Sequence, residues 1–238
     1  MPSQAPILIL PGWRVPADRY RELAKLLSKK GKTVKVIDFP GFGTIAAPEK
    51  AWNLDNFVDY VKYYISRNKL NPAIIIGHSF GGRVGIRLAA TTEGVVRSLI
   101  LTGTPGLPPV RNMKRIIFYY LSKLIKPLFQ LPLLNQIRPI SRRVLYRLVG
   151  STDYLFVEGV MKTTFQNIVR DDLVMNMKNI KIPTLMVWGR NDSMVSYRIA
   201  MQMKSLIKNS ELKIIANRGH GVLYEFPDEF IHQLQSFL

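Results

Sequence analysis

The chain has 238 residues, enough for one domain with a sizeable core and too few for two ordinary domains. Hydrophobic residues make up 47%, which is typical of a globular protein, and the absence of cysteine excludes disulfides, cysteine–zinc sites and thiol nucleophiles. The net charge is +18, and positive charge is concentrated in residues 105–152, which carry 9 Lys/Arg and no acidic residue.

This basic segment has two interpretations that the sequence leaves open. It could make peripheral contact with an anionic membrane, or it could be ordinary solvated surface. No base-reading motif accompanies the charge, so we expect no nucleic-acid partner. The apolar run at 7–10 is too short for a signal peptide or a membrane span, so we expect a soluble, cytoplasmic protein of unknown oligomeric state.

Short apolar runs alternate with helical patterns along most of the chain. The expected strands are 5–10, 33–39, 73–77, 96–103, 184–189 and 211–217, and the expected helices are 18–30, 54–68, 81–91, 196–207 and 228–238. Apolar runs separated by helices predict a mostly parallel sheet covered on both faces. Right-handed crossovers make it a doubly wound α/β sheet of about six strands.

Residues 105–182 interrupt this alternation. Within them, 111–126 spaces apolar side chains at a helical period with Lys/Arg between them, and a stretch around 154–169 is also helical in pattern. We interpret 105–182 as a helical cap, or lid, inserted between the two parts of one core domain, 1–104 and 183–238.

Ser79 is the predicted nucleophile. The sequence Gly-His-Ser-Phe-Gly at 77–81 follows an apolar strand and opens a helix, which is the context of a nucleophile elbow. The turn is so sharp that its neighbours must lack bulk, which explains Gly77 and Gly81. The helix N-terminus beneath the serine favours developing negative charge. The alternative is a glycine-rich turn with an exposed serine.

A serine hydroxyl needs a base within hydrogen-bonding reach, and the chain has only three histidines. His78 is the immediate neighbour of Ser79, points away from it and is expected to pack behind the site. His232 lies inside the last helix and is expected to be ordinary surface or core. His220 lies in a loop after the last strand, at the edge where Ser79 is expected, so it is the predicted base.

The third member of a triad is an acid that fixes the histidine tautomer. Asp192 lies in the loop after the fifth strand, again on the carboxyl side of the sheet. Asp171 and Asp172 precede that strand, and Asp172 is the alternative. The order Ser, Asp, His is the order of hydrolases with a nucleophile elbow.

The backbone N–H groups of Phe80 and Trp13 are the predicted oxyanion hole, because one donor follows the nucleophile and the other comes from the loop after the first strand. Gly12 would let that loop approach a ligand. The predicted substrate contacts are Gly12, Arg14, Tyr120, Met194 and Val222. Arg14 could equally be an ordinary solvated arginine, as could Arg190. The prediction includes no metal.

Four segments, "GHSFGG", "DFPGFG", "WGRND" and "GHGVLYEFP", resemble those of capped esterases and carbon–carbon hydrolases of the α/β-hydrolase family. Their order also matches, along nearly the whole chain. The resemblance implies the family's eight-stranded fold with a cap inserted after the sixth of those eight strands, the same Ser–Asp–His roles and no cofactor. The chain starts on the strand that is usually third, which reduces the sheet to about six strands. Gly41 and Gly43 match structural turn positions.

The resulting hypothesis is a carboxylesterase that cleaves small-molecule esters with medium, largely apolar acyl groups, or lactones, through an acyl-enzyme. Carbon–carbon hydrolases of ring-cleavage products are the first alternative, although Gly221 and Val222 follow His220 where such enzymes often carry Trp. A ligand-binding protein that kept the triad without turnover is the second.

Overall fold

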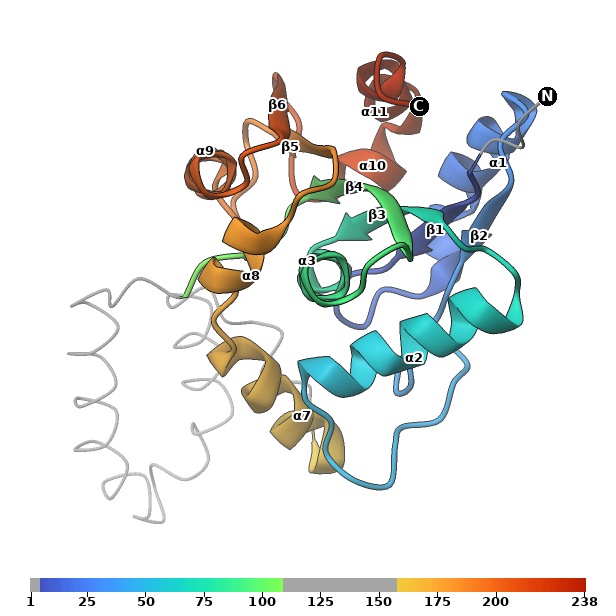
Figure 1. Cartoon of the computed structure of the whole chain (residues 1–238), viewed down its shortest axis with the longest axis vertical. Coiled ribbons are helices and arrows are strands. Elements are labelled where there is room, and N and C mark those ends of the chain that lie inside the picture. Colours follow the sequence, from blue (N-terminus) through green and yellow to red (C-terminus); the bar gives the residue numbers. More distant parts are fainter. Residues whose placement is uncertain (1–4, 109–157) are drawn as a thin grey trace, which may run out of the picture.

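The computed structural model describes residues 5–108 and 158–238 (Figure 1). Their strands form a six-stranded sheet in the order β2-β1-β3-β4-β5-β6, and every neighbouring pair is parallel. The strands are β1 (Ile7–Leu10), β2 (Val34–Val36), β3 (Ala73–His78), β4 (Val96–Thr102), β5 (Thr184–Gly189) and β6 (Ser210–Ile215). The predicted doubly wound α/β-hydrolase sheet is confirmed.

Helices cover both faces of this sheet. They are η1 (Ala17–Tyr20), α1 (Arg21–Lys29), α2 (Leu54–Arg67), α3 (Phe80–Thr91), α7 (Gly159–Arg170), α8 (Val174–Asn179), α9 (Tyr197–Leu206), α10 (Val222–Glu225) and α11 (Pro227–Leu234). In Figure 1, α1, α10 and α11 lie on one side of the strands and α2, α3 and α8 on the other. Alternate strand residues supply the two cores, so Ile75 packs toward α2 and α3 while Ile74 and Ile76 pack toward α1 and α11.

The long helix α2 shows how the sequence produces these elements. Its N-cap, Asn53, forms a reciprocal capping box with Asn56, which satisfies N–H groups at the start of the helix. The buried side chains follow a helical period and are Leu54, Phe57, Val58, Val61 and Ile65. The helix therefore buries one stripe against the sheet and α3.

The structure differs from the sequence-based expectation mainly in short elements. The predicted helix 18–30 begins as the 3-10 turn η1 before α1, and the predicted strand 33–39 keeps only three residues as β2. The helices α8 and α10 were not predicted, because six and four residues are too few to show a helical period.

The chain reverses direction across the sheet between β2 and β3, since both strands pair with β1. The carboxyl ends of β1 and β3 therefore flank a topological switch point, where α/β sheets bind ligands. The loop that starts with Pro11 and the elbow that holds Ser79 both begin there.

Residues 109–157 lie outside the described residues, and with them most of the predicted cap, the pattern at 111–126 and Tyr120. The cap boundaries and the membrane contact therefore stay predictions.

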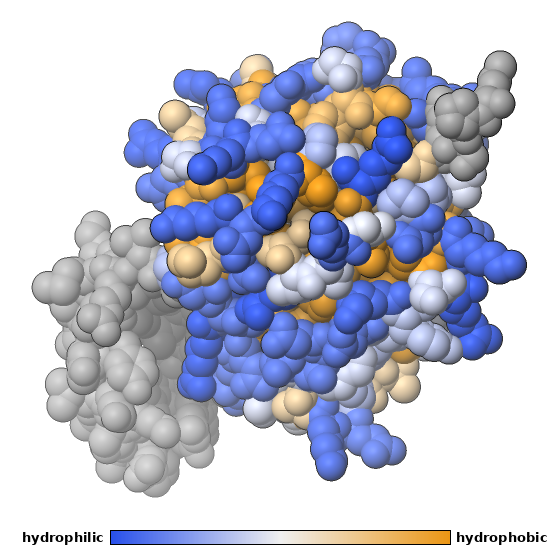
Figure 2. Space-filling view, in the orientation of Figure 1, coloured by the Kyte–Doolittle hydropathy of each residue, from blue (hydrophilic) through white to orange (hydrophobic). Residues whose placement is uncertain are grey.

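The described helix α8, within 105–182, packs against α3 and α9. In the two described ranges no helix has the length and apolar character needed to cross a bilayer. Hydrophilic side chains cover much of the face in Figure 2, with apolar residues between them.

Candidate active site

Ser79 occupies a strained turn between β3 and α3. Its φ of 51° and ψ of −113° fall where residues other than glycine are uncommon. A Cβ on Gly81 would lie 2.1 Å from the Leu10 carbonyl oxygen, and one on Gly77 would lie 2.5 Å from Gly82 Cα. The turn therefore requires glycine on both sides of the serine, as the sequence predicts for an elbow.

Asp192 and His220 meet at the carboxyl ends of β5 and β6. The distance from His220 Nδ1 to Asp192 Oδ2 is 2.8 Å, and the Asp192 side chain is 1% exposed. The other oxygen, Oδ1, accepts the backbone N–H groups of Met194 and Val195 at 2.9 and 2.8 Å. These bonds fix the carboxylate so that it accepts the Nδ1 proton and leaves Nε2 as the basic nitrogen.

Close backbone contact brings the Asp192 and His220 loops together. A Cβ on Gly189, the last residue of β5, would lie 2.4 Å from the carbonyl oxygens of Arg218 and Gly219. The Asn191 N–H donates to the Arg218 carbonyl at 2.8 Å. The two loops therefore cross directly before the residues that form the hydrogen bond.

The end of β4 contacts both Ser79 and His220. The Ser79 N–H donates to the Thr102 carbonyl at 2.9 Å, and a Cβ on the next residue, Gly103, would lie 2.7 Å from His220 Cε1. Within the described chain, Ser79 Oγ and His220 Nε2 have no hydrogen-bond partner. The structure thus gathers all three predicted triad residues at one edge of the sheet, joins Asp192 to His220 and leaves the Ser79 hydroxyl unbonded.

The competing candidates make other contacts. Asp172 Oδ1 accepts the Val174 N–H at 2.9 Å at the start of α8, and Asp171 pairs with Arg87 at 2.8 Å. His232 is exposed on α11. Of the acids and histidines weighed from the sequence, Asp192 and His220 are the described pair whose side chains bond to each other.

Two unpaired backbone donors flank the elbow. The Gly81 N–H donates to the Pro11 carbonyl at 3.0 Å, which packs the loop after β1 onto the start of α3. The N–H groups of Trp13 and Phe80 make no hydrogen bond among the described residues, and the two rings lie 5.4 Å apart. Both predicted oxyanion donors are therefore without a competing hydrogen bond in the part of the chain that the structure describes.

Apolar rings surround this pair of donors. The Trp13 ring contacts Phe42 at 4.8 Å and Phe165 of α7 at 5.0 Å, measured between ring centroids. A Cβ on Gly41 would lie 2.6 Å from Met161 Sδ, also on α7. The first described helix after residue 157 therefore lies against the loop that carries Trp13, and it makes that side of the site apolar.

The remaining predicted substrate contacts lie in different environments. Arg14 is exposed with a φ of 56°, and Met194 is 59% exposed. Val222 is fully buried in the core between the sheet and the α1 and α11 layer. Arg190 is exposed, with its guanidinium 5.4 Å from the Tyr197 ring centroid. Tyr120 lies outside the described residues.

Sequence reasoning missed a buried chain of hydrogen bonds behind the elbow. The Gly12 N–H donates to Tyr20 Oη at 2.9 Å, Tyr20 Oη lies 2.8 Å from His78 Nδ1, and His78 Nε2 lies 3.2 Å from the His220 carbonyl oxygen. Burial raises the pKa of Tyr20 well above its usual range. Burial, and then the proximity of His220, lower the pKa of His78 to about 3. Tyr20 carries no motif signal, so only the fold identifies it.

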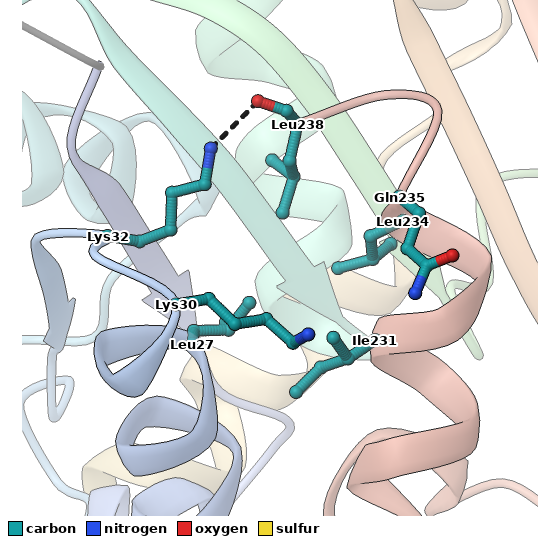
Figure 3. Close-up of a pocket in the computed structure, with 7 residues that line it drawn as sticks. All are labelled: Leu27, Lys30, Lys32, Ile231, Leu234, Gln235 and Leu238. Atoms are coloured by element: carbon teal, nitrogen blue, oxygen red, sulfur yellow. Dashed lines mark hydrogen bonds between the residues drawn. The ribbon is translucent and has the colours of Figure 1, made fainter.

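A groove of about 200 Å³ lies between α1 and α11 (Figure 3). Its lining residues are Leu27, Lys30, Lys32, Ile231, Leu234, Gln235 and Leu238, and Lys32 Nζ donates to the Leu238 carbonyl at 2.8 Å. Lys32 lies two residues before the start of β2, which puts the groove at the amino ends of the strands. The groove is therefore at the opposite edge of the sheet from His220 and Asp192.

Comparison with known proteins supports the fold and a hydrolase activity. The family model described as "Serine aminopeptidase, S33" matches residues 1–227. The AB hydrolase superfamily protein YisY of Bacillus subtilis is 32% identical over 98% of this chain and 91% of its own length. Monoacylglycerol lipase ABHD6 of Bos taurus is 28% identical over 98% of this chain and 74% of its own length.

Two further similarities concern a different substrate class and the fold. The 2-hydroxy-6-oxo-6-(2'-aminophenyl)hexa-2,4-dienoic acid hydrolase of Metapseudomonas resinovorans is 24% identical over 98% of this chain and 83% of its own length. The structure of an esterase from Exiguobacterium antarcticum superimposes with a TM-score of 0.72 at 21% identity, covering 99% of this chain and 92% of that one.

Proposed function

The chain belongs to the serine aminopeptidase S33 family of α/β-hydrolases, and we propose that it is a serine esterase that cleaves esters of medium, largely apolar acyl groups or lactones. Ser79 is the nucleophile, His220 the general base and Asp192 the acid that orients the histidine. The hydrogen bond between Asp192 and His220, at the sheet edge that carries the elbow serine, is the observation that carries the proposal.

The chemistry follows from the free atoms at this edge. In the proposed mechanism Ser79 Oγ donates to His220 Nε2 when substrate is bound, since such catalytic hydrogen bonds often tighten only then. Oγ attacks the ester carbonyl as Nε2 takes its proton. The N–H groups of Trp13 and Phe80 then hold the oxyanion. His220 returns the proton to the departing alcohol and next activates the water that releases the acyl group.

The apolar surroundings of Trp13 support an apolar acyl group. Phe42, Phe80 and Phe165 contact the Trp13 ring, so an acyl chain bound beside the proposed oxyanion donors would leave water for an aromatic surface. Similarity to monoacylglycerol lipases supports the same substrate class.

The test combines a fluorophosphonate probe with p-nitrophenyl esters of increasing acyl length. We expect the protein to be labelled and to turn over esters, and Ser79→Ala to lose both activities. Ser66→Ala, at an exposed serine on α2, is the matched control and should behave like the wild type. Turnover that survives Ser79→Ala would refute the proposal, as would a folded protein that neither reacts with the probe nor cleaves any ester.

Carbon–carbon hydrolysis is the second candidate, favoured by the similarity to the dienoic acid hydrolase of Metapseudomonas resinovorans. The same triad and oxyanion donors would serve that reaction. A spectrophotometric assay with a 2-hydroxy-6-oxo-dienoate separates the two. We expect kcat/KM for the preferred p-nitrophenyl ester to exceed that for the dienoate, and the reverse order would establish the second candidate.

A further inference from the structure

We propose that Tyr20 and His78 are positioning residues that hold the oxyanion loop and the His220 loop in one fixed arrangement around Ser79. The inference rests on the proposed function. Its basis is the buried chain of hydrogen bonds that runs from Gly12 through both side chains to the backbone of His220.

With Tyr20 and His78 both neutral, as their burial favours, only one arrangement of protons satisfies all three hydrogen bonds. The Gly12 N–H can only donate, so Tyr20 Oη accepts from it at 2.9 Å. The Tyr20 hydroxyl proton is then available for His78 Nδ1, 2.8 Å away. His78 therefore carries its own proton on Nε2 and donates it to the His220 carbonyl oxygen. Both side chains are neutral in this arrangement.

Both ends of this chain of hydrogen bonds lie next to groups that take part in the proposed reaction. Gly12 precedes Trp13, whose N–H is one oxyanion donor, and the bond at the other end goes to the backbone of the general base itself. His78 precedes the nucleophile. The network therefore touches the loops on both sides of Ser79 without contacting the substrate.

Burial makes the arrangement specific. Tyr20 is fully buried and His78 is 1% exposed, so water cannot replace a lost partner. A Cβ on Gly12 would lie 2.9 Å from His78 Nδ1, which means that the oxyanion loop packs directly on the imidazole. The Tyr224 ring, 5.4 Å from His78, closes another side of the imidazole.

The test uses Tyr20→Phe, His78→Leu and the double variant, with p-nitrophenyl butyrate as substrate. Tyr20→Phe keeps the ring but removes the hydroxyl. We expect each single change to lower kcat by about 10- to 100-fold with KM within about 3-fold, because reacting groups are misplaced while substrate contacts remain. The kcat of the double variant should be no lower than that of the slower single variant, because both substitutions interrupt the same chain of hydrogen bonds.

Two further variants separate positioning from stability. His78→Gln keeps an amide donor that can reach the His220 carbonyl, so it should recover part of the kcat that His78→Leu loses. Tyr64→Phe, at a partly buried tyrosine of α2 whose hydroxyl has no hydrogen-bond partner among the described residues, should leave kcat unchanged. Lower melting temperatures with unchanged kcat would overturn the proposal, and so would multiplicative losses in the double variant.

A protein without any esterase or dienoate activity would refute the proposed function but not this network. Nitrogen-15 NMR of the imidazoles then decides, since the chain has only three histidines. We expect His78 as the Nε2–H tautomer, and we expect Tyr20→Phe to shift the resonances of both His78 and His220. A His78 proton on Nδ1, or His220 resonances unmoved by Tyr20→Phe, would overturn the inference.

Discussion

Asp192 Oδ2 lies 2.8 Å from His220 Nδ1, while the other carboxylate oxygen is occupied by two backbone N–H groups. The two oxygens of Asp192 are therefore not equivalent. Oδ1 accepts from backbone N–H groups of its own loop, whereas Oδ2 determines which nitrogen of His220 carries the proton.

Asp192→Asn should lower kcat by a factor on the order of 10⁴ with little loss of stability. The amide oxygen must take the Oδ1 position, because Met194 and Val195 offer only donors there. The amide NH₂ then faces His220 Nδ1 and forces the proton onto Nε2, which can no longer accept from Ser79. Steady-state kinetics with a p-nitrophenyl ester measures the loss.

The matched control is Asp172→Asn, at the exposed acid that accepts the Val174 N–H at the start of α8. Its kcat should remain within about 2-fold of the wild type, because exposed substitutions away from the site have small effects. An equal loss in both variants would contradict the assignment of Asp192.

Gly103→Ala should lower kcat by about 10- to 100-fold, because the new Cβ would lie 2.7 Å from His220 Cε1 and must displace the imidazole. The positive φ of 58° adds strain, which should lower the free energy of unfolding by about 1 kcal/mol. Gly94→Ala has the same strain at a φ of 74°, but its Cβ meets open space. It should lose similar stability in urea titrations and retain full kcat, and a comparable kcat loss at Gly94 would contradict the explanation.

The sequence predicted the sheet and the elbow well, because these features have local signals. Buried strands show as apolar runs, and the turn between β3 and α3 has glycines on both sides of Ser79 within a few residues. Asp192 and His220 were also found locally, since each lies in a loop directly after a predicted strand. Their mutual hydrogen bond follows from the parallel direction of those strands.

The contacts behind the elbow could not be found in this way. Tyr20 meets His78 across 58 positions of the chain, and a tyrosine in a helical segment has no motif that marks it. The contacts of Arg83 have no sequence signal either, because it donates to backbone carbonyls, which any residue type can supply. The helices α8 and α10 were missed because, with six and four residues, they are shorter than two turns of a helix.

Arg83→Met should lower the free energy of unfolding by about 2–4 kcal/mol. The guanidinium is buried and donates to the carbonyls of Pro105, Ile168 and Asp171, which lie on both sides of residues 109–157. Burial lowers its pKa to about 10, so it stays charged at neutral pH. Methionine would leave three carbonyl oxygens without their donor. Urea titration is the measurement, and Arg97→Met, at an exposed arginine, should change stability by less than about 0.5 kcal/mol.

Acidification from pH 7 to pH 5 should destabilise the fold through His78. Burial and His220 lower its pKa from 6.5 to about 3, so the folded imidazole stays neutral while the unfolded one binds a proton. Below pH 6.5 the unfolded state therefore holds the extra proton, and the free energy of unfolding falls by up to about 1.4 kcal/mol per pH unit.

His78→Gln removes this titration. Urea titrations at pH 5, 6 and 7 should therefore show a free energy of unfolding that changes less steeply with pH than in the wild type. Equal slopes for His78→Gln and the wild type would mean that His78 is not held neutral in the folded protein.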